Sequence, residues 1–106
     1  MSSVMSEWTV ELTGDGYLRL SAALAERFFP HGVLVPLVKP GEWWLLPTRG
    51  AAAGGLLLKV RNPAGDRAVL VRDLLDELGG TVRPGVLPAS WDHHAGALRV
   101  QLGGNA

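Results

Sequence analysis

The chain has 106 residues, 47% of them hydrophobic, and its ten basic side chains balance its ten acidic ones. This length fits one globular domain, and a formal net charge of zero excludes the long-range positive field that drives non-specific binding to nucleic acids. The sequence has no cysteine, which excludes disulfides, thiolate metal ligands, iron–sulfur ligation and a cysteine nucleophile. The first residues lack the pattern of a signal peptide, and no apolar run reaches the roughly 20 residues that span a bilayer, so we expect a cytoplasmic protein.

The N-terminal third predicts two strands followed by a short helix. WTVEL (8–12) and YLRL (17–20) alternate in polarity on either side of the turn TGDG. Ser21 is a typical N-cap for a helix over AALAERFF (22–29), because its hydroxyl can accept a free amide of the first turn. The proline and glycine that follow end this helix.

VLVPLV (33–38) and EWWLLP (42–47) predict a β-hairpin joined by KPG. Neither strand has a clean polar face, whereas one side of an antiparallel strand normally faces water. We therefore expect a second copy of the chain to cover the hairpin, which predicts a homodimer. Trp43 and Trp44 are neighbours on a strand and face opposite sides. One should enter the core, and the other should lie on a contact surface, so both are candidate partner-binding residues.

LLLKVRNPAGDRAVLV (56–71) predicts two strands around a turn rich in Asn, Pro, Gly and Asp. Lys59 and Arg61 have the same parity and share one face of the first strand, and Arg67 can join them from across the turn. Such a basic cluster suits a carboxylate or a phosphate of a partner, so these three residues are further candidates for partner binding. The alternative is a solvated turn whose local ion pairs contribute less than about 1 kcal/mol.

RDLLDEL (72–78) predicts a short amphipathic helix ended by Gly79 and Gly80, and a last hairpin follows over VLPASW (86–91) and ALRVQL (97–102). The turn of this hairpin contains Asp92, His93 and His94, residue types that bind metals or carry protons. Three histidines in the whole chain, two of them adjacent, rarely make a closed metal site. We expect no metal, no cofactor and no catalytic residue, and we expect Asp92 to fix the turn.

These elements predict a mainly β fold with two short helices, arranged as a small barrel-like assembly of hairpins. We expect a disordered N-terminus over residues 1–6, a single domain over 7–102 and a disordered tail over 103–106. Leu20, Leu24 and Phe28 are echoed by Leu70, Leu74 and Leu78 at an offset of 50, which indicates either an internal duplication or chance in a leucine-rich chain.

Two resemblances bear on function. Residues 15–28, within DGYLRLSAALAERF, resemble the AbrB/MraZ class of bacterial DNA-binding domains, although Ser21 stands where proline is usual. The segments GYLRL, WLLPTRG, GGLLLKVRN, GDRAVLV and WD followed by GALRV, in this order, resemble a small bacterial family encoded beside the genes for nickel–iron hydrogenase and its maturation. The second resemblance implies an accessory role in hydrogenase assembly and gives no catalytic residues.

We therefore expect a non-enzymatic protein-binding accessory protein in hydrogenase maturation, whose partner is a hydrogenase subunit or a maturation factor. We expect no membrane association. The alternative is a dimeric DNA-binding regulator of the AbrB/MraZ type, and a small enzyme or ligand-binding barrel is a third possibility.

Overall fold

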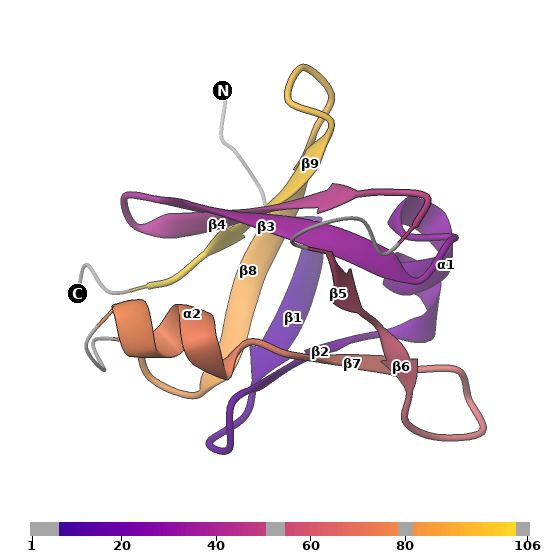
Figure 1. Cartoon of the computed structure of the whole chain (residues 1–106), viewed down its shortest axis with the longest axis horizontal. Helices are drawn as coiled ribbons and strands as arrows, with labels where there is room; N and C mark the ends of the chain where they lie inside the picture. The colour runs from indigo at the N-terminus through magenta and orange to yellow at the C-terminus, as the bar shows by residue number, and fades with distance from the viewer. Residues whose placement is uncertain (1–6, 51–54, 79–81, 104–106) are drawn as a thin grey trace.

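The computed structural model describes residues 7–50, 55–78 and 82–103, and these residues form one sheet of nine strands with antiparallel pairing throughout. The strand order is β5-β3-β4-β9-β8-β1-β2-β7-β6. The two edge strands, β5 and β6, are consecutive in the chain, so the sheet curls until its edges meet and forms a nearly closed barrel (Figure 1). This confirms the predicted mainly β fold with two short helices and a barrel-like assembly of hairpins.

Three hairpins build most of the barrel wall, and all three were predicted from the strand patterns and turn residues of the sequence. They are β1 (Trp8–Leu12) with β2 (Tyr17–Leu20), β3 (Val33–Lys39) with β4 (Glu42–Pro47), and β8 (Gly85–Asp92) with β9 (Ala97–Gln101). The third hairpin joins the other two, because β8 pairs with β1 and β9 pairs with β4.

Helix α1 (Ala22–Phe28) begins at Ser21, as predicted, and the Ser21 hydroxyl accepts a hydrogen bond from the Leu24 amide. Leu24 is fully buried, so this helix packs onto the barrel core. Helix α2 (Arg72–Glu77) has no buried residue, and Leu74 and Leu75 only partly pack against the core. Neither helix in the described part of the chain is long and apolar enough to cross a membrane.

The prediction of one continuous strand over residues 56–60 is wrong. The segment divides into β5 (Leu56–Leu57), which pairs with β3, and β6 (Lys59–Val60), which pairs with β7 (Arg67–Leu70). Leu58, between them, is buried, and its amide donates to the Gly32 carbonyl at 2.8 Å. The chain crosses from one edge of the sheet to the other at this buried leucine.

The core consists of the inward-facing side chains of the strands together with residues of α1. Its largest fully buried members are Trp43 and the leucines at positions 12, 18, 20, 24, 34, 45 and 98. The segments expected to be disordered at the two ends, and the glycine pair expected to end α2, lie outside the described residues, apart from Gly103.

Candidate partner-binding surface

The barrel does not close where β5 and β6 separate, and a groove of about 390 Å³ lies there. In the described chain, β5 and β6 each have a strand on one side only, and on the side of β7 that faces away from β2, Val69 and Leu70 lie beyond the first residue of β6 and have no ladder partner. Six exposed side chains line this groove, and we call them the seam: Tyr17, Leu57, Lys59, Val60, Arg61 and Leu70. The seam therefore combines free strand edges with exposed side chains.

The seam is unusually apolar for a surface that faces water. Leu57, Val60 and Leu70 are 54%, 63% and 50% exposed, and Tyr17 is 39% exposed. Four of the seven large hydrophobic side chains that are exposed in the described residues thus meet at one groove. Contiguous exposed apolar surface on a soluble protein marks an interaction site more often than scattered single residues do.

The register explains why Tyr17 and Leu70 reach the surface together. They are directly paired between β2 and β7, whereas the next pair, Leu18 and Val69, is buried. Neighbouring pairs of a sheet point to opposite faces. The two leucines that correspond at an offset of 50 residues differ in their surroundings, because Leu20 is 1% exposed whereas Leu70 is half exposed. Sequence reasoning missed Tyr17, Leu57, Val60 and Leu70, although three successive leucines at 56–58 signal that one must point outward.

The predicted basic cluster is only partly formed. Val60 pairs with Arg67 and Lys59 pairs with Ala68, so Arg67 projects from the face opposite to that of Lys59. The guanidinium of Arg67 donates to the Gly65 carbonyl, within the turn itself. The prediction that all three cations share a face is therefore wrong for Arg67. Lys59 and Arg61 are exposed, make no salt bridge within the described residues, and stay at the seam.

The turn between β6 and β7 also has a structural role. Asp66 accepts a hydrogen bond from the Ala22 amide at 2.9 Å and another from the Asn62 side chain at 3.0 Å. The bond from Asn62, followed by the bond from the Ala22 amide, lowers the pKa of Asp66. Asp66 thus fastens the turn to the first turn of α1, and this holds Arg61 in place beside the groove.

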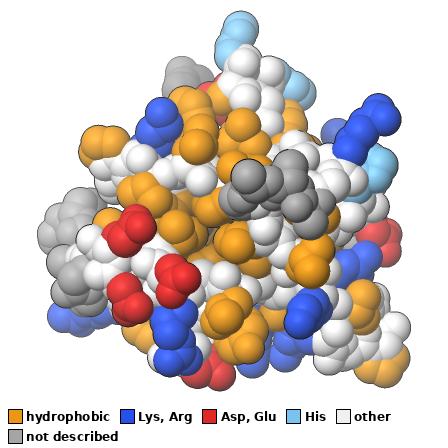
Figure 2. Space-filling view, in the orientation of Figure 1, with side chains coloured by type: hydrophobic (Ala, Val, Ile, Leu, Met, Phe, Trp, Pro, Cys, Tyr) orange, Lys and Arg blue, Asp and Glu red, His pale blue; other side chains and the backbone are white. Residues whose placement is uncertain are grey.

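Helix α2 begins two residues after Leu70 of the seam and carries three acids and one basic residue, Arg72. Asp73, Asp76 and Glu77 are exposed on it. In Figure 2 the acidic side chains gather to the left of the hydrophobic area, and basic side chains lie below it and to its right. Lys59 and Arg61 therefore line the groove with positive charge, whereas α2, which carries three acids and Arg72, lies outside the lining of the groove.

The two tryptophans lie away from the seam, on β4. Trp43 is fully buried, so it is the member of the pair that enters the core. Trp44 is on the outer face, where the Lys39 ammonium lies 4.7 Å and the Arg99 guanidinium 5.2 Å from its ring centroid. Of the two, only Trp44 can contact a partner on this face.

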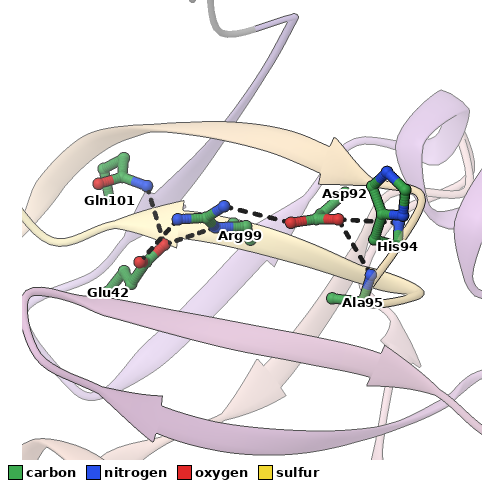
Figure 3. Close-up of polar contacts among 6 residues, drawn as sticks. All are labelled: Glu42, Asp92, His94, Ala95, Arg99 and Gln101. Carbon is green, nitrogen blue, oxygen red and sulfur yellow. Dashed lines mark hydrogen bonds and ion pairs between the residues drawn. The ribbon is translucent and has the colours of Figure 1, made fainter.

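Arg99 is the centre of a polar network beside Trp44 (Figure 3). It donates two hydrogen bonds of 2.9 Å to the Glu42 carboxylate and one of 3.2 Å to Asp92. Hydrogen bonding from Arg99 is the main cause of a lowered pKa of Glu42. This network covers the outer face of β4 and β9 with polar groups of the chain itself.

Asp92 fixes its turn, as predicted. Its Oδ1 accepts the amides of His94 and Ala95 at 2.9 and 3.0 Å, and the bond from the Ala95 amide is the main cause of its lowered pKa. Both histidines of the turn are exposed. Within the described ranges, no three His, Asp or Glu side chains converge in a way that could hold a metal ion.

Compared with protein-family models, with curated proteins and with solved structures, the chain shows no significant match.

Proposed function

We propose that this protein is a non-enzymatic, cytoplasmic accessory protein that binds a partner protein at the seam, and that the partner belongs to the nickel–iron hydrogenase assembly system. The single observation that carries the binding role is the convergence of four exposed hydrophobic side chains on a groove between free strand edges. The proposal that the partner belongs to the hydrogenase system rests only on the resemblance of the sequence segments.

The groove suits an extended segment of a partner. A free strand edge can hydrogen-bond to an added strand, and pockets beside it select alternate side chains of that strand. Leu57, Val60 and Leu70 supply apolar contacts, and burying half of such a side chain contributes about 1 kcal/mol. The expected ligand is therefore an extended peptide with alternating apolar side chains.

Charged residues near the groove favour one orientation of the bound segment. Lys59 and Arg61 favour acidic side chains of the partner at the β6 end of the groove, and the net negative charge of α2, which follows β7 in the chain, favours basic ones near the end of β7. Such complementarity mainly raises the association rate and selects against wrong partners, so binding should weaken moderately as salt increases.

The test is binding of the purified chain to purified hydrogenase subunits and maturation factors, measured by biolayer interferometry. Val60→Asp should weaken binding at least tenfold, which corresponds to about 1.4 kcal/mol, because a charge would enter the apolar groove. Val86→Asp is the matched control, since Val86 is 68% exposed on β8 and the strands β1, β2 and β7 separate it from β6. Equal affinities of the two variants would contradict the proposal.

Heparin retention separates this proposal from the alternative of a DNA-binding regulator. A DNA-binding face would give strong retention that falls steeply with salt. We expect the chain to elute at low salt, because its basic and acidic side chains are equal in number. Retention that depends on Lys59 and Arg61 would favour the DNA-binding alternative.

A further inference from the structure

A second concave site lies beside α1 and shares no lining residue with the seam. Three aromatic rings pack together there. The Phe28 ring of α1 packs edge-on against Trp8, with 5.5 Å between the ring centroids. It also stacks on Trp91, with 4.5 Å between the centroids and 9° between the ring planes. All three are only partly buried. This site therefore presents aromatic surface to its surroundings.

A pocket of about 380 Å³ lies beside these aromatic rings. Phe28 and Trp91 form part of its wall, and Pro30 and Pro47 add apolar surface. This volume lies in the range of about 300–1,000 Å³ that is usual for small-molecule sites. The proposed partner-binding role makes no use of this pocket.

The rim of the pocket is cationic. Arg27 and Arg49 supply this charge, both are exposed, as is His31 beside them, and none of the described residues that line the pocket is acidic. The Arg27 guanidinium lies 5.6 Å from the centroid of the Phe28 ring. Two acids are adjacent in sequence to residues of this pocket: Glu26, next to Arg27, has its carboxylate near Gly65, and Asp92, next to Trp91 on the strand, points to the opposite face, where Arg99 binds it.

Flat aromatic walls and a cationic rim together select a planar ring that carries negative charge. Base stacking on aromatic side chains contributes about 1–3 kcal/mol, and Arg forms strong, charge-assisted hydrogen bonds with phosphate oxygens. A nucleotide has both parts in one molecule. We propose that this pocket binds a nucleoside phosphate, with the base against the Phe28–Trp91 wall and the phosphate between Arg27 and Arg49.

The test is titration of the purified chain with AMP, followed by tryptophan fluorescence and by calorimetry. We expect saturable binding that partly quenches the tryptophan emission, because Trp91 is the one of the four tryptophans that lines the pocket. Arg27→Gln and Arg49→Gln should each weaken it about tenfold, the effect of losing one charge-assisted hydrogen bond. Both side chains are exposed, so these variants should fold. Arg83→Gln is the matched control, because Arg83 is exposed just before the opposite end of β8 from Trp91.

Three further ligands test the base and phosphate parts of the proposed site and the source of the nucleotide. Adenosine and inorganic phosphate should each bind much more weakly than AMP, because each uses half of the site. A short single-stranded oligonucleotide that binds more tightly than AMP, with the same sensitivity to Arg49→Gln, would identify the nucleotide as part of a strand; tighter binding of AMP would identify a free nucleotide. Absence of AMP and oligonucleotide binding at millimolar concentration, or binding that neither arginine variant weakens, would overturn the proposal.

Discussion

Replacing Arg99 by methionine isolates the largest polar network of the described chain. Met keeps most of the apolar stem that packs beside Trp44 but removes the guanidinium that binds Glu42 and Asp92. Gln101 then remains as the Glu42 partner, at 3.1 Å. We expect the variant to fold, because Arg99 is about a third exposed at its side chain, and to be less stable than the wild type.

The magnitude follows from the geometry. An exposed ion pair contributes up to about 1 kcal/mol, and the two parallel bonds of 2.9 Å to Glu42 place this pair at the upper end, less some screening by solvent. Loss of the cation over Trp44 adds about 0.5–1 kcal/mol. Together these give about 1–2 kcal/mol, or roughly 5–10 °C in Tm for a domain of this length.

The same network predicts how stability depends on pH. The pKa of Glu42 is lowered from its ordinary value of 4.5, mainly by Arg99, and that of Asp92 is lowered from 3.8, mainly by the Ala95 amide and in part by Arg99. A carboxyl with a lowered folded-state pKa stabilises the fold above its unfolded pKa and ceases to do so as pH falls through the folded value. The difference in Tm between the wild type and Arg99→Met should therefore be constant from neutral pH down to about pH 5 and shrink below it.

Differential scanning calorimetry over this pH range measures the effect, with Arg83→Met as the control for losing an exposed arginine. Asp15 and Asp66, whose pKa values are also lowered, titrate in wild type and variant alike, so the difference reports the network. A Tm difference that does not change with pH, or one no larger than that of the control, would refute this assignment of the Arg99 interactions.

Other substitutions test the packing and the assembly. Leu24→Ala should destabilise the fold by about 2–5 kcal/mol in urea unfolding, because this side chain of α1 is fully buried. Gly16→Ala should cost about 1–3 kcal/mol in the same assay, since Gly16 has a φ of +94° and an added Cβ would lie 3.1 Å from the Arg72 Cβ. Trp44→Ser should leave the chain folded while shifting the predicted homodimer towards monomer in sedimentation equilibrium, whereas Trp43→Ser should unfold it; a monomeric wild type at micromolar concentration would contradict the dimer.

The parts of the fold that depend on local signals could be predicted from the sequence. The alternation of WTVEL and YLRL, the Ser21 cap and the turn residues give strands, helices and hairpins close to those observed. The break at Leu58 could not be predicted in this way. It depends on a long-range choice, in which β5 pairs with β3 and β6 pairs with β7, and the run LLLKV is equally compatible with one strand.

The candidate site shows the same limit. Lys59 and Arg61 were identified by their type and parity, and both line the groove. Arg67 was assigned to the wrong face because the register across the turn, with Val60 opposite Arg67, is not encoded in the composition of the turn. Tyr17 and Leu70 are distant in sequence, so pairing alone brings them together at the surface.

The most direct measurement of the central claim is photo-crosslinking in the native host, with a benzoylphenylalanine placed at position 60 or, as the control, at position 86. The side chains at both positions are more than half exposed, and only Val60 lines the seam. A partner at the seam predicts a discrete protein adduct from position 60 that is absent from position 86 and contains a hydrogenase subunit or maturation factor. No adduct from position 60, or the same adducts from both positions, would contradict partner binding at the seam.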